Sequence, residues 1–342
     1  MTFAIVLIFF HHRSRSSPNL VPWLKRVLAL DLIGNAILLG ASTMLFLALQ
    51  SAEQRYSWQS ARVVGLLCGF AFTLLIFVAW MSYKGETALL PPRIILQRTV
   101  LSSCLAAFFT YACLLIHTYY LPIWFEAVKG TSAVHAGVNM IPYMCANALF
   151  SLIAGIVVSK NGLFAPPAIL GYAIATVGAA LLSTLQIDTS SAKWIGYEIL
   201  TSVGLGLAIQ QGFTAVQTVL PIEEVPIGTA AVVASQSFGG AVFVSVGNTL
   251  LRNHLLDPNQ DKLVPGVDIS VVLAAGATAF RGLVPASALL PLLRLYNAAL
   301  RKVFIAAIPM AGLTFVTSLG MEWKSLHGKE REKGQEEARE KA

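Results

Sequence analysis

Eight apolar segments dominate the chain, and each is long enough to form a helix across a lipid bilayer. They are 28–50, 63–83, 99–125, 134–158, 163–186, 195–220, 227–251 and 302–321. Crossing about 30 Å of hydrocarbon takes roughly 20 helical residues, because lipid offers no partner for an open backbone hydrogen bond. Strands of a membrane barrel need only about ten residues of alternating polarity, so a barrel does not fit. We therefore predict an all-α integral membrane protein with about eight transmembrane helices.

The composition excludes a soluble enzyme. Hydrophobic residues make up 56% of the chain and charged residues 12%, whereas a soluble domain carries about 25% charged residues. The formal net charge of +7 comes from bases between apolar segments rather than from one patch. This pattern is typical of cytoplasmic loops, not of a nucleic-acid surface. The expected partner is the lipid bilayer, with no nucleic acid.

The loops also predict an orientation. One alternate set contains eight Lys and Arg residues, in loops 11–27, 84–98, 159–162 and 221–226. The opposite short loops contain four, in 51–62, 126–133 and 187–194. The positive-inside rule places the richer set, and with it both chain ends, in the cytoplasm. Loop 252–301 then lies outside, and its stretches 269–280 and 282–293 are expected to form surface helices.

A stripe of polar or small residues runs along segment 134–158, at Asn139, Tyr143, Asn147, Ser151 and Gly155. A step of four residues keeps side chains near one face of a helix. Such a face is unsuited to lipid, so it either packs against other helices or lines a water-filled cavity. Because Pro142 removes a backbone donor, a bend is expected there.

Amide side chains mark the next candidates for a substrate cavity, at Gln210, Gln211, Gln217 and Gln236. An amide has two donors and an acceptor that lipid cannot satisfy. We expect these side chains to contact substrate or water. The glycines that follow Gln236, including Gly239, Gly240 and Gly247, are expected to allow close helix approach.

Ionisable residues inside the segments are few, and they are the candidates for proton coupling: Glu198, His117 and Asp31. An acid within a membrane helix is a default proton site. The alternatives are ordinary ones: Asp31 and Glu198 lie near segment ends that water can reach, and His117 can hydrogen-bond to a neighbouring helix.

Motifs of soluble catalysis are missing, since the sequence contains no GxSxG, HExxH or P-loop pattern. The four cysteines have neither CxxC spacing nor a histidine arranged for metal binding. We expect no enzyme activity, no metal and no cofactor. What remains is transport driven by an ion gradient.

Five stretches resemble one known family. They are ALDLIGNAILLGASTMLFLALQ (29–50), YLPIWFEAVKGTSAVHAGVNMIP (120–142), WIGYEILTSVGLGLAIQQGFTAVQTVLPIEEVPIGTA (194–230), SQSFGGAVFVSVGN (235–248) and RLYNAALRKVF (294–304). With these the chain resembles the fungal fourteen-span drug:proton antiporters of the major facilitator superfamily, which export toxins and drugs.

The resemblance implies a division of the chain. Residues 1–26 would be the remnant of a truncated helix and a basic cytoplasmic loop, and 27–98 the additional central helix pair with a cytoplasmic linker. Residues 99–321 would form the C-terminal six-helix domain, with 252–301 as its outer loop, and 322–342 a charged cytoplasmic tail. The N-terminal domain would be absent, so a separate N-terminal half or a second copy of the chain would have to complete the carrier.

A superfamily signature, G-x-L-a-D-r-x-G, has a partial counterpart at 155–162. Gly155, Lys160 and Gly162 occupy matching places, whereas Ser159 stands where the signature has Asp. The resemblance implies that this segment lies at the cytoplasmic side.

The expected function is proton-coupled efflux of small amphipathic organic molecules across the plasma membrane, incomplete in this chain as written. The alternative is a truncated, non-transporting membrane protein that binds or regulates a partner.

Overall fold

A computed structural model describes residues 31–54, 58–257, 264, 267–282 and 284–326. In this part of the chain, eight helices are long and apolar enough to cross a membrane, which confirms the predicted number. They are Leu32–Ala52, Ala61–Thr87, Arg98–Lys129, Ala133–Asn161, Ala165–Leu182, Ser191–Val219, Val225–Leu255 and Ala286–Ser318. The predictions for 1–26, and for the tail beyond residue 326, lie outside the described residues.

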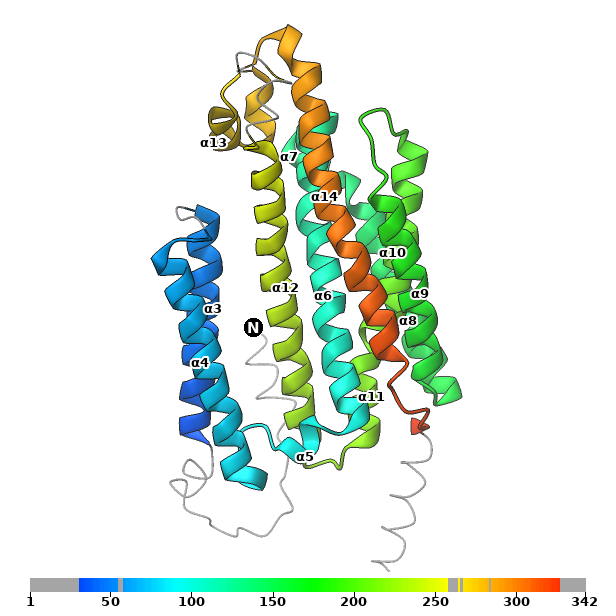
Figure 1. The fold of residues 1–342 in the computed structure, drawn as a ribbon. Coiled ribbons are helices and arrows are strands. Elements are labelled where there is room, and N and C mark those ends of the chain that lie inside the picture. Colours follow the sequence, from blue (N-terminus) through cyan, green and yellow to red (C-terminus); the bar gives the residue numbers. More distant parts are fainter. Residues whose placement is uncertain (1–30, 55–57, 258–263, 265–266, 283, 327–342) are drawn as a thin grey trace, which may run out of the picture.

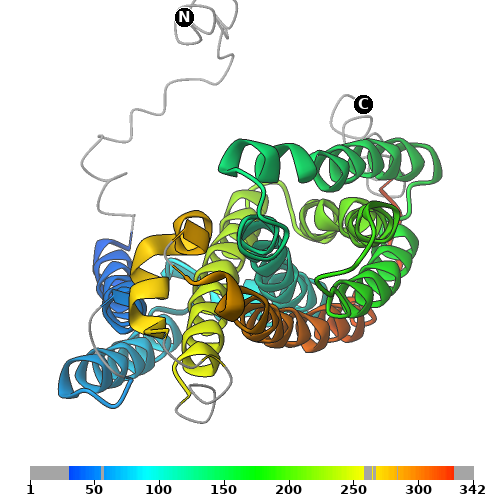
Figure 2. The same cartoon turned by 90° about the horizontal axis from the view of Figure 1, so that it is seen from above.

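The first two spans form a hairpin beside the other helices (Figures 1 and 2). Helix α3 (Leu32–Gln54) packs on α4 (Ala61–Lys84), and the pair meets the rest of the protein at α12 (Val225–Leu255). The Phe46 and Phe238 rings stack with their centroids 5.9 Å apart. Trp58 donates a 2.9 Å hydrogen bond to the Thr249 hydroxyl. The hairpin is thus attached along one edge.

A short linker joins this hairpin to the remaining spans. It contains a 3-10 turn, η1 (Gly85–Thr87), and one helical turn, α5 (Pro92–Ile95). Arg93 forms ion pairs with Glu86 in the linker and with Glu224, just before α12. The Arg93 side chain is 60% exposed, so this contact between the two parts of the chain is a surface one.

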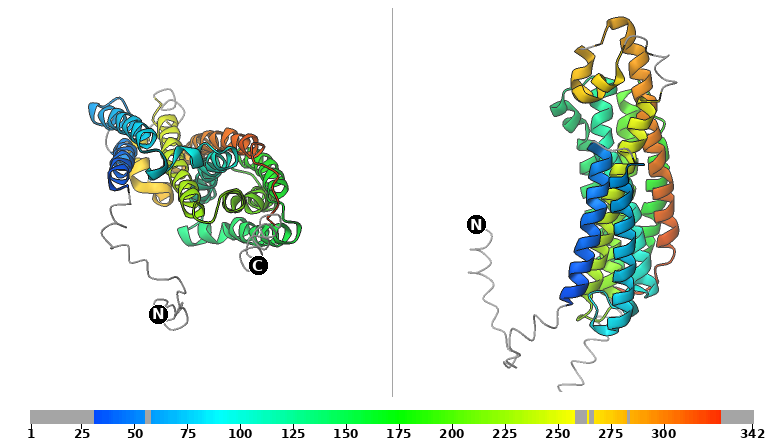
Figure 3. Two further views of the ribbon diagram at one scale, coloured as in Figure 1. Left: turned by 90° about the horizontal axis from the view of Figure 1, so that it is seen from below. Right: turned by 60° about the vertical axis from the view of Figure 1, so that its left-hand side comes forward.

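The remaining six spans pack into one bundle, in which α6 (Arg98–Trp124) contacts both α12 and α14 (Ala286–Ser318). Helix α6 continues as a π-helical turn, η2 (Phe125–Lys129). The other elements are α7 (Ala133–Asn139), α8 (Ile141–Asn161), α9 (Ala165–Leu182), α10 (Ser191–Ile209), α11 (Gln211–Val219), α13 (Ile269–Ala279) and η4 (Phe280–Gly282). Figure 3 shows the bundle from below, with α3 and α4 to one side of it.

Two of the predicted spans are broken. The first break lies at Met140, between α7 and α8, where Pro142 occupies the first turn of α8 and cannot donate to the preceding turn. This confirms the expected bend. The second break, at Gln210, separates α10 from α11 within predicted span 195–220. No proline or glycine at position 210 signals it.

The prediction for the outer loop is partly wrong. Residues 269–280 do form a surface helix, α13, with a turn at Gly276 where φ is 81°. Residues 282–293 do not form a separate helix, because α14 runs unbroken from Ala286 to Ser318. Its charges at Arg294, Arg301 and Lys302 suggested a loop, yet the helix continues through them and extends beyond the ends of neighbouring helices (Figure 3).

Glycines allow the helices of the bundle to touch backbone to backbone. A Cβ at Gly204 of α10 would lie 2.5 Å from the Gly171 carbonyl oxygen of α9, and one at Gly206 would lie 2.5 Å from the Asn147 carbonyl oxygen of α8. On α12, a Cβ at Gly239 would collide with the Phe108 carbonyl of α6. The expected packing role of the α12 glycines is confirmed.

We predict that Gly204→Ala destabilises the protein by about 1–3 kcal/mol, because the added methyl forces α10 away from α9. The matched control is Gly196→Ala on the same helix, where a Cβ meets nothing within 4 Å. There the substitution should be neutral or stabilise by about 0.5–1 kcal/mol, since alanine favours a helix. Thermal unfolding of both variants in detergent measures the difference, and equal melting temperatures would contradict the proposed crossing.

Candidate functional site

Three polar residues from three helices meet inside the bundle: His117 of α6, Tyr143 of α8 and Glu198 of α10. All three side chains are fully buried. The His117 and Tyr143 rings lie edge to face, with their centroids 6.4 Å apart. The Glu198 carboxylate lies within electrostatic range of the Tyr143 hydroxyl. The structure therefore places two of the predicted coupling residues beside one predicted cavity residue.

The packing of α8 on α10 fixes this arrangement. Ser202, one turn beyond Glu198, donates a 2.6 Å hydrogen bond to the Tyr143 carbonyl. Gly206, one turn further, lies against the Asn147 carbonyl. Since residues four apart share a helix face, Glu198, Ser202 and Gly206 all face α8. The crossing thereby carries Glu198 into the interior.

Several polar atoms of this cluster have no hydrogen-bond partner in the described part of the protein. They are both Glu198 carboxylate oxygens, the Tyr143 hydroxyl, His117 Nε2 and Asn147 Nδ2. Leaving one buried polar atom unpaired costs about 1–3 kcal/mol, and more for a charged group. Buried polar groups are otherwise nearly always paired, and exceptions often have a functional role.

The arrangement suits the holding of a proton. A carboxyl group without fixed partners can change its protonation state, and Glu198 is such a group. His117 Nδ1 faces the Cys113 thiol of its own helix at 3.7 Å, so the expected hydrogen bond from His117 to a neighbouring helix is not seen. The expectation that water reaches Glu198 from the interface is also wrong, because the side chain is fully buried.

The predicted cavity amides divide into two groups. Gln211 and Gln236 are buried, and Gln211 Nε2 donates to the Leu207 carbonyl at 3.2 Å. Gln210 and Gln217 are exposed on the surface of this chain. Adjacent helical residues point about 100° apart, so Gln210 and Gln211 cannot share one environment. The adjacent pair is therefore not a single contact surface.

The polar stripe of segment 134–158 winds from the interior to the surface. Tyr143 is buried, Asn147 is half-buried and Gly155 is exposed. Each four-residue step turns the stripe by about 40°, which explains the drift. Asn139 lies on the separate helix α7 and is half-buried. The helix-packing interpretation therefore fits the buried part of the stripe, at Tyr143, and the cavity interpretation fits its more exposed part.

At the end of α8 the stripe opens on a shallow hollow of about 560 Å³, lined by Ser151, Gly155, Ser159 and Lys160 among others. The signature-like segment ends α8 here. Gly162 adopts a φ of 72° and donates to the Val158 carbonyl at 2.7 Å, as a helix C-cap does. The Gly162 carbonyl accepts a bond from the Leu326 amide at 2.9 Å. This segment therefore binds the chain that follows α14.

Asp31 lies just before α3 and not one turn inside a span, which differs from the expected position. It precedes α3 and caps that helix, accepting a 2.9 Å bond from the Gly34 amide. It also accepts bonds from Trp80 Nε1 at 2.9 Å and from the Leu89 amide at 3.2 Å. Burial opposes ionisation, but these hydrogen bonds outweigh it and lower the pKa of the Asp31 carboxyl. Asp31 holds α3 to α4 and to the linker.

The sequence did not indicate a second polar network, at the end of the bundle where α9 ends and α14 begins. Trp124 Nε1 donates to Asn297 Oδ1 at 2.8 Å, and Asn297 Nδ2 donates to the Leu185 carbonyl at 3.3 Å. Arg281 donates to the Ala127 and Val128 carbonyls in η2. The available signal was a polar Asn297 between the apolar residues Leu295, Tyr296, Ala298 and Ala299. In the described residues, no group of three His, Cys, Asp or Glu could hold a metal ion.

Comparisons with known proteins identify the class. Efflux pump roqT of Penicillium rubens is 40% identical over 95% of this chain and 60% of its own length. MFS-type efflux pump MFS1 of Trichophyton rubrum is 37% identical over 96% of this chain and 61% of its own. Efflux pump aflT of Aspergillus parasiticus is 35% identical over 87% and 58%. The chain spans about 60% of the length of these relatives. No protein-family model matches it.

Among solved structures, the fold is similar to a bacterial homolog of the human lysosomal transporter Spinster in an inward-facing, occupied conformation. The TM-score is 0.53 at 14% identity, over 82% of this chain and 63% of that one. Fold and helix content thus define a multi-pass membrane protein with the architecture of a transporter domain. By sequence the chain is a homologue of fungal MFS-type efflux pumps over almost its whole length.

We predict that Asp31→Ala lowers the stability of the α3–α4 hairpin by about 1 kcal/mol, since it removes a helix cap and two further bonds. The folded pKa of Asp31 is depressed, so its contribution is present above the ordinary value of 3.8 and is lost as pH falls through the lower folded value. Denaturant unfolding followed by tryptophan fluorescence measures this. Wild type and variant should converge only below that pH. Glu223→Ala, at an exposed acid, is the control and should change nothing.

Proposed function

We propose that this chain forms part of a proton-coupled carrier that exports small amphipathic organic molecules. The efflux activity named for its relatives supports this, as does their 35–40% identity across almost the whole chain. The carrier acts at the plasma membrane, with both ends of the chain in the cytoplasm. It needs no cofactor, because the proton gradient supplies the energy.

The observation that carries the coupling part of the proposal is the buried group of His117, Tyr143 and Glu198. With a proton, Glu198 is neutral and fits among apolar helices at modest cost. Without it, the charge is expensive in this surrounding unless it gains water or a positive partner. Protonation therefore favours close packing of α10 on α8, and deprotonation favours opening of this crossing. The same burial disfavours a positive charge on His117, so the proton leaves Glu198 for water when the crossing opens.

The substrate contacts in this proposal come from α8, α11 and α12. Asn147, Gln211 and Gln236 provide amide groups next to apolar walls, which matches an amphipathic molecule. The exposed Gln210 and Gln217, with Asn139, contact the other half of the carrier. That half is an N-terminal domain or a second copy of this chain. Alternating access then follows from rocking of the two halves about a central site.

A second candidate function is that of a non-transporting membrane protein that binds or regulates a carrier. The exposure of Gln210 and Gln217 on the surface of this chain favours it. It requires a contact surface, but neither a cavity nor a proton site.

Reconstitution into vesicles tests the proposal. With an imposed difference of about two pH units, one-proton exchange supports accumulation of a cationic dye up to about 100-fold. Glu198→Gln should abolish this accumulation but retain dye binding, because Gln is neutral and similar in shape. Glu223→Gln, at an exposed loop acid, is the control and should behave as wild type.

A second measurement separates the two candidate functions. Infrared difference spectra of the purified chain should show a protonated carboxyl band that disappears in Glu198→Gln. If wild type binds no dye and lacks this band although it is folded, the carrier proposal is wrong and the regulatory function stands. If Glu198→Gln still accumulates dye against the gradient, Glu198 is not the coupling residue.

A further inference from the structure

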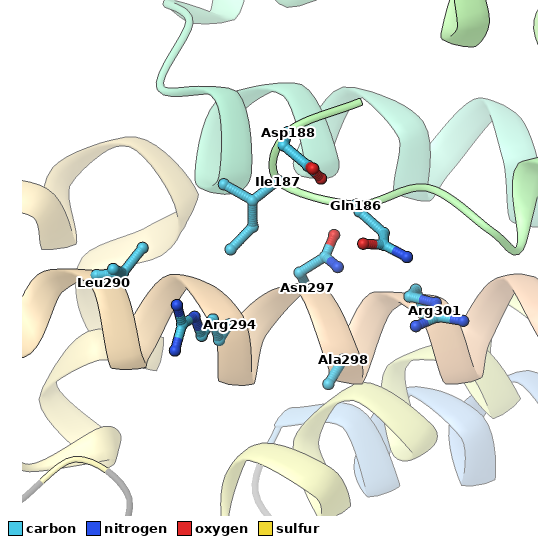
Figure 4. Close-up of a pocket in the computed structure, with 8 residues that line it drawn as sticks. All are labelled: Gln186, Ile187, Asp188, Leu290, Arg294, Asn297, Ala298 and Arg301. Atoms are coloured by element: carbon cyan, nitrogen blue, oxygen red, sulfur yellow. The ribbon is translucent and has the colours of Figure 1, made fainter. Parts of the chain in front are cut away.

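A pocket of about 550 Å³ lies between α14 and the connection from α9 to α10, away from the buried cluster of His117, Tyr143 and Glu198. Figure 4 shows Arg294, Asn297 and Arg301 on α14 opposite Gln186, Ile187 and Asp188 of the connection. The pocket lies on the side of the bundle formed by α9 and α14. It contains none of the residues of the His117 cluster.

The pocket has an excess of positive charge. Neither Arg294 nor Arg301 forms an ion pair with any carboxylate that the structure describes. Arg301 Nε donates to the Ser183 carbonyl at 3.0 Å, which leaves its other guanidinium donors available. Arg294 is exposed. Arg294 and Arg301 lie two turns apart on one face of α14, so they line the pocket at its two ends (Figure 4).

Asp188 is the one acid at the pocket, and Lys129 offsets its charge. Lys129 Nζ donates to the carbonyls of Ile187 and Thr189, at 2.8 and 2.7 Å, on either side of Asp188. The ammonium group also lies within electrostatic range of the Asp188 carboxylate. The net charge of the pocket region thus remains positive, and the connection is fixed in place.

The depth of the pocket matches the boundary of the hydrocarbon layer. Helix α9 has 18 residues and so spans about 27 Å, close to the hydrocarbon thickness of about 30 Å. Its end at Leu182 therefore marks the boundary, and Ser183, which binds Arg301, lies just beyond. Helix α14 has 33 residues, about 50 Å, and extends past that level with Arg294. Phospholipid phosphates lie at this depth.

We propose that Arg294 and Arg301 bind a phosphate group, that of a phospholipid whose acyl chains lie along α9 and α14. Arginine is well suited to phosphate, because its planar donors form charge-assisted bonds with phosphate oxygens. Leu290, Ile187 and Ala298 provide the apolar part of the pocket. The exposed apolar side chains Val177 and Ile305 continue this surface into the membrane on α9 and α14.

Native mass spectrometry of the whole purified chain tests this, with dioleoyl phosphatidylglycerol as the probe. Dioleoylglycerol, which lacks the phosphate, is the matched control lipid and should not be retained. The double variant Arg294→Gln, Arg301→Gln should lose roughly tenfold in affinity for the phospholipid, the effect of losing charge-assisted bonds. Lys302→Gln removes a neighbouring exposed charge that does not line the pocket, and it should bind as wild type.

Further measurements identify the source of the phosphate and distinguish the loss of a binding site from misfolding of the variant. Arg294→Gln alone keeps the Arg301–Ser183 bond, so a loss of affinity in this variant with unchanged helix content supports the proposal. Equal losses in the Lys302→Gln variant, or retention of dioleoylglycerol, would overturn it. If inorganic phosphate binds in an arginine-dependent manner while the phospholipid does not, the lipid source is wrong and the ligand is a soluble anion.

Discussion

The close crossing of α10 over α8 and α9 is the contact on which the rest of the bundle depends. In lipid there is no hydrophobic gain from bringing helices together, so association relies on close packing and on internal hydrogen bonds. Gly204 and Gly206 permit that packing, and the Ser202 bond to the Tyr143 carbonyl adds the polar link. The same approach buries Glu198 and Tyr143, groups that would be very costly against acyl chains. Stability and the candidate chemistry therefore share one interface.

Much of the fold was predictable, because the span of a membrane helix depends on length and polarity alone. All eight spans, the bend beside Pro142 and the packing glycines of α12 follow from the sequence. The start of α14 was not predictable. The charge of Arg301 suggested a loop, but a hydrogen bond to the Ser183 carbonyl stabilises this residue within the helix. The break at Gln210 likewise depends on how α11 packs, for which residue 210 gives no signal.

The candidate site was only partly predictable. Glu198 and His117 stand out because ionisable residues are rare in such segments, but nothing in the sequence says that they meet at Tyr143. That depends on the rotation of three helices about their axes. The same rotation separates Gln210 from Gln211, although they are neighbours in the chain. Asp31 was misplaced because the apolar run begins before α3 does, and its role as a cap becomes visible only with Trp80 and Leu89 in place.

The ion pairs of Arg93 determine how firmly the hairpin is held at the base of α12. Arg93 connects Glu86, on the hairpin side, with Glu224 at the base of α12. Exposed ion pairs contribute about 0–1 kcal/mol, so thermal motion opens and re-forms them readily. This contact between the linker and the base of α12 is therefore reversible and does not hold the two parts rigidly together. Arg93 can therefore release Glu224 and re-form this ion pair while the hairpin stays attached to α12 through Phe46 and Trp58.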